Sequence, residues 1–187
     1  FVESRWEEGE LITDVLTAGS GGLENITLGA SGRSNTLRAG DAYAADINGD
    51  RIMEIPESAG DILNWYSLDP SGRKSLAVTS YHSFEDGWFL SLPEAFMTGK
   101  LTVRREDALP GETAVTFLLD GRETLVIYTL TGENRLDRAG EEPRFLLAEA
   151  GDTVYAGQIL AEELLTKNAI TEGFNLIYPE WQTGDLG

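Results

Sequence analysis

Apolar and polar residues alternate in short runs through the second half of the chain, and turn residues separate these runs. Alternation with a period of two is typical of β-strands that have one buried face. The pattern predicts strands over residues 76–81, 87–92, 101–105, 113–119, 123–130, 145–148, 153–156 and 174–178. Short connections join several of them, including Asp120-Gly121, a dipeptide typical of tight hairpins. Strands joined by such turns run antiparallel.

One late segment departs from the strand pattern. Residues 161–168 are rich in helix formers and group their apolar side chains on one side, so they predict a helix. We expect the side that carries Leu164 and Leu165 to pack on the sheet. The predicted fold class is therefore α+β: an antiparallel β-meander sheet with one late helix packed on a face, preceded by a Gly-rich all-β segment.

Glycine interrupts the first forty residues repeatedly, with short apolar runs at 11–16 and 26–28 between the glycines. This pattern predicts short strands joined by turns, of which Gly19-Ser20-Gly21-Gly22 is one. The apolar residues are too few for an independent core, so we expect the segment to complete something larger. The predicted domains are residues 1–60, as the end of a larger repeat domain, and 61–187. The start at Phe1 suggests a truncated or processed product.

The composition excludes several classes of protein. The chain carries 32 acidic and 14 basic residues, a formal charge of -18. Such a surface repels nucleic acid and anionic membranes and suits cation binding or a basic partner. Cysteine is absent, which excludes a disulfide framework, a thiolate nucleophile and a cysteine zinc site. No run of about 18 apolar residues is present, so no transmembrane segment is predicted.

Residues 46–57 place oxygen-bearing groups at alternate positions, as loops that wrap calcium do. A calcium loop supplies ligands from about six positions, namely 1, 3, 5, 7, 9 and 12. Counted from Asp46, these positions hold Asp46, Asn48, Asp50, the carbonyl of Ile52, Glu54 and Glu57. The sixth position turns sharply and favours glycine, but here it is Arg51.

Two other interpretations of this loop remain open. Asn48-Gly49 is a strong turn dipeptide, and acidic side chains beside turns often cap backbone amides. Alternatively, the loop descends from a calcium site that no longer holds metal.

Other groups that carry chemistry have ordinary structural interpretations. His82, the single histidine, has no nucleophile-elbow sequence beside it, and a surface or hydrogen-bonded role is predicted. Glu85 and Asp86 could form part of a glycosidase carboxylate pair, but they look more like turn residues. The tryptophans could form a sugar-stacking platform, although packing is the preferred interpretation for Trp88 and Trp181. No catalytic residue is therefore assigned.

The segment from Asp46 through Glu54-Ile55-Pro56 resembles the calcium-loop segment of FG-GAP/VCBS-type repeats, with Arg51 in place of the family's glycine. These are β-propeller-like repeats of secreted bacterial proteins whose loops often bind calcium. The resemblance implies that Asp46, Asn48, Asp50 and Glu54 are side-chain ligands.

The stretch from Asp86 to Trp181 resembles PsbP/Mog1-like domains of bacterial extracytoplasmic lipoproteins. The residues that carry the resemblance are 86–93, the later hairpins, residues 153–156, the following helix and the strand that begins at Phe174. Members of this family act mostly as scaffold or binding modules, so the resemblance supplies no catalytic set.

These observations together predict a non-catalytic binding or scaffold module of a bacterial secreted or surface lipoprotein, with a structural calcium loop. Its expected location is extracytoplasmic, secreted or lipid-anchored at the cell surface, and its expected partner is a protein or a glycan. The alternative is a carbohydrate-acting hydrolase that uses a carboxylate pair. A third possibility is a structural domain whose acidic loop only caps turns.

Overall fold

The computed structural model describes residues 1–29, 32, 34, 36–39 and 42–177. It divides into two compact units, of which one contains Phe1–His82 and the other is Ser83–Leu176. The predicted boundary at residue 60 differs from this division, because it falls in the turn between two paired strands, Ile55–Ala59 and Ile62–Leu68. Both strands of this pair lie in the first unit.

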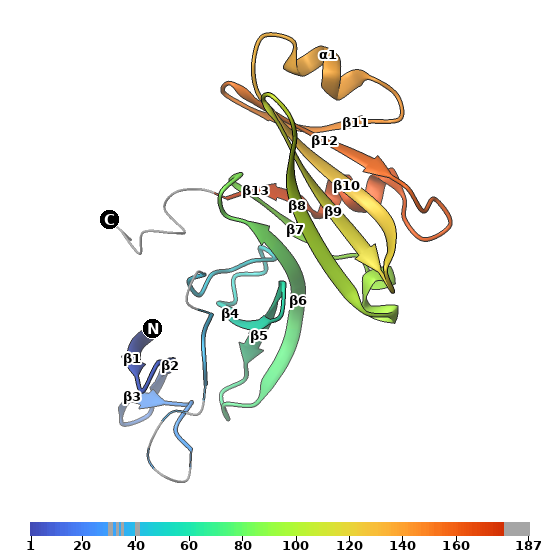
Figure 1. The fold of residues 1–187 in the computed structure, drawn as a ribbon. Coiled ribbons are helices and arrows are strands. Elements are labelled where there is room, and N and C mark those ends of the chain that lie inside the picture. Colours follow the sequence, from blue (N-terminus) through green and yellow to red (C-terminus); the bar gives the residue numbers. More distant parts are fainter. Residues whose placement is uncertain (30–31, 33, 35, 40–41, 178–187) are drawn as a thin grey trace. The chain divides into compact units, whose positions relative to one another are not determined.

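The first unit consists of two groups of antiparallel strands joined by irregular segments (Figure 1). The first group has the order β1-β2-β3, and the second pairs β4 with β5 and β5 with β6. Their bounds are β1 Val2–Glu7, β2 Glu10–Gly19, β3 Gly22–Asn25, β4 Ile55–Ala59, β5 Ile62–Leu68 and β6 Lys74–Ser83. The predicted turn at Gly19–Gly22 joins β2 to β3 and is confirmed, whereas residues 26–28 form no strand.

The second unit is built on a five-stranded antiparallel sheet with the order β11-β12-β10-β9-β8. Its strands are β8 Leu101–Leu109, β9 Glu112–Leu119, β10 Arg122–Leu130, β11 Phe145–Ala150 and β12 Thr153–Ile159. Two short strands, β7 Trp88–Ser91 and β13 Phe174–Leu176, pair with each other, and a 3-10 turn spans Glu94–Thr98. The antiparallel strands predicted for this half are confirmed over the described residues; Tyr178 lies outside them.

The sheet is a meander only as far as β10. The chain then passes to the outer edge as β11 and returns as β12, which pairs with β10. Asp120 and Gly121 both adopt positive φ angles, 52° and 80°, as the two-residue turn between β9 and β10 requires.

The helices differ from the prediction. Two are present in the described part of the second unit, α1 Arg135–Gly140 and α2 Lys167–Gly173. The predicted helix at 161–168 is wrong in position, because the amides of Leu160 and Ala161 both donate to the carbonyl of Thr124 and hold the chain against β10. The hydroxyl of Thr166 then caps α2 by accepting from the amide of Ala169. Neither helix is long and apolar enough to cross a bilayer.

The core of the second unit fills both sides of the sheet. Ala139 of α1 packs with Leu130, Val154 and Ala156 on one face. Aromatic rings fill the remaining core, with Phe96 and Phe117 5.7 Å apart and Trp88 5.5 Å from Phe174. Trp88 is fully buried, which confirms its predicted packing role.

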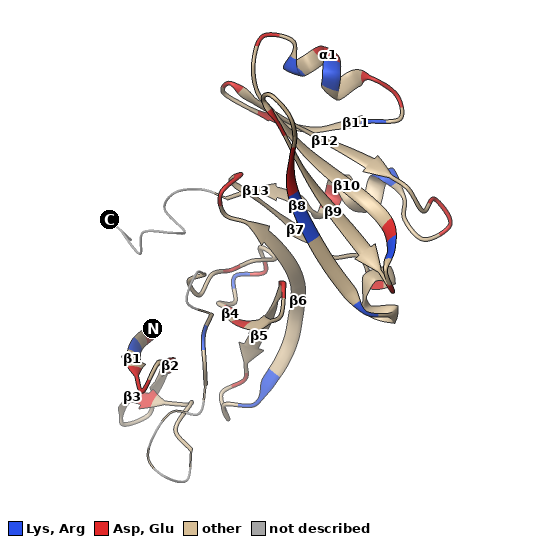
Figure 2. Ribbon diagram, in the orientation of Figure 1, with Lys and Arg blue, Asp and Glu red and all other residues tan. Residues whose placement is uncertain are grey.

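A buried ion network fastens the segment after α1 to the sheet. The carboxylate of Glu112 is buried and accepts from both terminal nitrogens of Arg144, at 2.6 and 3.2 Å. Arg138 of α1 lies 3.5 Å from the same carboxylate. The guanidinium of Arg144 also stacks 3.8 Å from the ring centre of Tyr128. Because a buried carboxylate is costly without a cation, this network fixes α1 on the sheet. Arginine and acidic residues alternate along this region in Figure 2.

Replacing Arg144 with leucine should lower the free energy of unfolding by about 3 kcal/mol, because the charge of Glu112 would stay buried with Arg138 alone. Urea denaturation measures this loss. Arg104→Leu is the control, since Arg104 pairs with Glu123 at the exposed surface, where solvent screens the pair and its loss should cost much less. Equal losses for the two variants would contradict the assigned role of Glu112.

Candidate metal centre

The loop predicted to bind calcium lies in the first unit and is closed at its base by backbone bonds. Ala45 and Glu54 exchange hydrogen bonds, with N–O distances of 3.1 and 2.8 Å. Strand β4 begins immediately after Glu54. The residues between them therefore form a closed loop held at the start of a strand.

The side chains at the first, third and fifth positions of the loop accept backbone amides, and those of the exposed residues Asn48 and Asp50 also bond to each other. Asp46 Oδ2 accepts from the amide of Arg51 at 2.9 Å, and Asn48 Oδ1 accepts from Asp50 at 3.0 Å. Asp50 Oδ1 accepts from the amide of Ile52 at 2.8 Å. The three predicted ligands that alternate along the sequence therefore curl around one loop, rather than pointing to opposite sides as in a strand.

Arg51 adopts the conformation that the sixth position of a calcium loop requires. Its φ angle is 71°, in the left-handed region, and Gly49 has a φ of 75°. A non-glycine residue in this region costs about 1–2 kcal/mol. The departure from glycine therefore strains the loop without changing its course.

Two carboxylate oxygens in the loop are buried and have no hydrogen-bond partner, Asp46 Oδ1 and Glu54 Oε1. Glu54 is fully buried, and its other oxygen accepts from the amide of Ile47 at 3.1 Å. Burial raises the pKa of Glu54, and the negative charges of Asp50 and Asp46 raise it further, while the Ile47 amide opposes the rise. An unpaired buried carboxylate is destabilising, and a hard cation would supply what both oxygens lack.

The structure separates one predicted ligand from the others. Glu57 lies in β4, and its carboxylate pairs with Lys74. Within the described residues, no cluster of three or more acidic or histidine side chains forms a ready metal site. Asp46, Asp50 and Glu54 therefore do not converge on one point in this structure, and a cation would have to draw them together with Asn48 and the carbonyl of Ile52.

His82 belongs to a hydrogen-bonded chain in the first unit. The indole N–H of Trp65 donates to Ser80 Oγ at 2.7 Å, and Ser80 Oγ lies 2.9 Å from His82 Nε2. Because an indole only donates, the serine hydroxyl accepts from Trp65, and it can either donate to Nε2 or accept from it. Burial lowers the pKa of His82 to about 4, and the predicted hydrogen-bonded role is confirmed.

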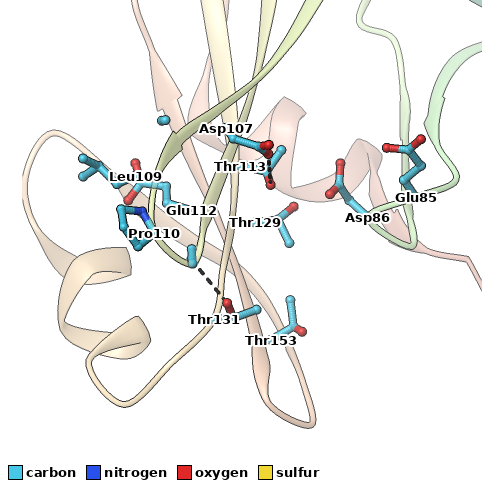
Figure 3. Close-up of a pocket in the computed structure, with 12 residues that line it drawn as sticks. Glu85, Asp86, Asp107, Leu109, Pro110, Glu112, Thr113, Thr129, Thr131 and Thr153 are labelled. Atoms are coloured by element: carbon cyan, nitrogen blue, oxygen red, sulfur yellow. Dashed lines mark hydrogen bonds between the residues drawn. The ribbon is translucent and has the colours of Figure 1, made fainter.

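The carboxylates considered for a hydrolase occupy a turn in the second unit. The guanidinium of Arg105 donates to both oxygens of Asp86 at 3.0 Å and lies 3.3 Å from Glu85. Sequence reasoning could not find this pair, because Asp86 and Arg105 are 19 residues apart. A cavity beside the turn has no aromatic residue in its lining (Figure 3). The hydrolase prediction gains no support from this geometry.

Of the three tryptophans that the structure describes, only one is exposed, so these three give no support to the alternative of a stacking platform. Trp65 and Trp88 are buried, Trp6 is 69% exposed, and Trp181 lies outside the described residues.

Comparisons of the chain with protein-family models, curated proteins and solved structures find no match. The two resemblances drawn from short motifs therefore stay predictions.

The neutral state of His82 makes stability depend on pH. Its pKa of about 4 in the folded state lies below the ordinary value of 6.5, so the unfolded chain takes up the proton first. Stability from this group is full above pH 6.5 and falls as the pH drops to 4, by up to about 3 kcal/mol. Chemical denaturation of the native protein and of His82→Phe across this window measures the difference. Parallel curves for the two proteins would contradict the assignment.

Proposed function

We propose that the chain is a non-catalytic binding or scaffold module in which a bound calcium ion rigidifies residues 46–54. The observation that carries this proposal is the pair of buried, unpartnered oxygens, Asp46 Oδ1 and Glu54 Oε1, in a loop with calcium-ligand spacing. In a loop whose carboxylates only capped turns, we would expect the second oxygen of each to face water, whereas here both are buried.

The chemistry of the donors favours calcium over other divalent ions. Every proposed ligand atom is an oxygen, which suits a hard cation and excludes a preference for zinc or copper. The carboxylates of Asp46, Asp50 and Glu54 would supply the charge, and Asn48 and the Ile52 carbonyl would complete the shell. Calcium supplies positive charge that offsets the burial of Glu54, and it ties the loop to the start of β4.

An extracytoplasmic location is part of the proposal. Calcium sites of extracellular modules typically bind at about 10⁻⁴–10⁻³ M, and a strained loop with Arg51 suits this weak range. The formal charge of -18 suits a surface exposed to dissolved cations. Both motif resemblances point to secreted or lipid-anchored proteins of bacteria, and a protein or glycan partner is proposed with them.

Calcium added after chelation should bind with measurable heat and raise the melting temperature. At about 100 times its dissociation constant, it adds about 2.7 kcal/mol to the free energy of unfolding. The gain should shrink as the pH falls, because the raised pKa of Glu54 lets protons compete for a ligand. Calorimetric titration and thermal melting measure these effects.

Matched variants locate the ion. Asp46→Asn and Glu54→Gln should each weaken calcium binding at least about tenfold. Glu57→Gln is the control and should leave it within about twofold, because Glu57 pairs with Lys74. If calcium produced neither heat of binding nor a change in melting temperature, the proposal would be contradicted. It would also be contradicted if all three variants weakened calcium binding equally.

Arg51→Gly should stabilise the calcium-free protein by about 1 kcal/mol and tighten calcium binding, because glycine removes the cost of the left-handed conformation and the competing cation. Arg51→Ala separates the two causes, since alanine removes the charge and keeps the strain. Thermal melting with chelator measures the first effect. A gain from alanine as large as the gain from glycine would rule out backbone strain as the cause.

A further inference from the structure

A cavity in the second unit lies at the end of the sheet beside the turn between β8 and β9, and Arg138 of α1 contacts three residues of its lining, Gly111, Glu112 and Thr131. Its volume is about 700 Å³, within the range of small-molecule sites. Figure 3 shows its lining, with Glu85 and Asp86 on one side and Leu109 and Pro110 on the other. All of its residues belong to the second unit, so the cavity is complete within one compact body.

The floor of the cavity is a row of polar residues that face the same side on neighbouring strands. Asp107 of β8 pairs in register with Thr113 of β9, and Thr113 pairs with Thr129 of β10. Tyr155 of β12 is opposite Thr129 in register but is not part of the lining. Residues directly opposite in register share a face. The next row on this face is apolar at its centre, with Val115 opposite Ile127. A polar floor therefore begins where the hydrophobic core ends.

One wall of the cavity is rigidly held. The hydroxyl of Tyr155 donates to the carbonyl of Asp86 at 2.9 Å. The guanidinium of Arg105 donates two hydrogen bonds to the carboxylate of Asp86. Ser83 Oγ also donates to Asp86, at 2.5 Å. These bonds fix the turn above the sheet, so the cavity does not depend on a mobile loop for its shape.

Several polar groups in the cavity are available to a ligand. The hydroxyls of Thr129 and Thr153 make no hydrogen bond within the described structure. Asp107 accepts one long bond, 3.4 Å from Thr113 Oγ1, and forms no ion pair there. Arg105, two residues before Asp107, bonds to Asp86 and Glu85, and Asp107 also acts on it through its charge without forming an ion pair. Asp107 is therefore the carboxylate that a ligand could engage.

The lining selects among ligand classes by its chemistry. It contains carboxylates, threonines and apolar side chains, and neither a basic nor an aromatic residue. Anions would be repelled, and quaternary ammonium groups and sugars would find no ring to contact. A primary ammonium has three donors, which one carboxylate and two hydroxyls can accept. Leu109 and Pro110 at the rim can contact an alkyl chain.

We infer that this cavity binds a primary alkylamine, with its ammonium group at Asp107 and Thr129 and its alkyl chain along Leu109 and Pro110. The inference gives the proposed binding role a ligand chemistry, and it does not involve the calcium loop, which lies in the other unit. Its failure would leave the calcium titration unaffected, so the two proposals fail separately.

Calorimetric titration of the full chain with cadaverine, with and without calcium, tests the inference. We expect saturable binding that Asp107→Asn weakens at least about tenfold and Thr129→Val weakens about threefold. A titration with 1,5-pentanediol, which has hydroxyls in place of the amines, should show no binding.

Two matched controls on β8 keep the test specific. Glu106→Gln changes the same charge one residue away on the opposite face, and Thr102→Val removes a hydroxyl from that same face. Both should bind cadaverine within about twofold of the native protein. Equal weakening by Asp107→Asn and Glu106→Gln would overturn the inference, because it would show attraction to the acidic surface alone. Absence of saturable binding in the millimolar range would overturn it as well.

A lysine with blocked termini distinguishes the two sources of this chemistry. Tighter binding than cadaverine would assign the cavity to a lysine side chain of a protein, and weaker binding would assign it to a free amine. Folding of each variant is checked by its melting temperature, and Thr129→Val keeps the test decisive if Asp107→Asn unfolds.

Discussion

A buried carboxylate requires positive charge or hydrogen-bond donors close to it, and this constraint shapes both units of the chain. For Glu112, side chains of the same unit supply the positive charge. Arg144 donates to both oxygens of its carboxylate, and Arg138 lies 3.5 Å away. Glu54 shows the same requirement met in part, because one oxygen accepts from a backbone amide and the other has no partner. The second unit therefore completes its buried charge with its own residues, while one oxygen of Glu54 in the first unit has no partner among the described residues.

The loop and the cavity are the two features on which we base the proposal of a binding protein. In the loop, strain at Arg51 and unpaired oxygens leave a conformation that calcium would complete. In the cavity, the groups that could act as acids or bases are tied to arginine, apart from Asp107. His82, the single histidine of the sequence, is neutral at pH 7 because burial lowers its pKa to about 4, and its Nε2 is hydrogen-bonded to Ser80.

Local signals predicted much of the fold, and the rest depended on contacts between distant residues. Asp120-Gly121 marks its hairpin by itself, and the calcium-loop spacing indicated side chains that accept backbone amides in the loop. Helix α1 has six residues, too few to show the periodic spacing of apolar residues from which a helix is predicted. The position of α2 depends on the carbonyl of Thr124, far away in sequence. The floor of the cavity could not be predicted, because the alternation of apolar and polar residues does not specify the register in which the strands pair.

The most direct test of the account is to locate the ion. Crystals grown with calcium should show an anomalous peak within about 2.3–2.6 Å of Asp46 Oδ1 and Glu54 Oε1. Asn48, Asp50 and the carbonyl of Ile52 should complete its shell, and Glu57 should remain paired with Lys74. A structure at saturating calcium in which those two oxygens bond only to water or protein, with no peak in the loop, would contradict it.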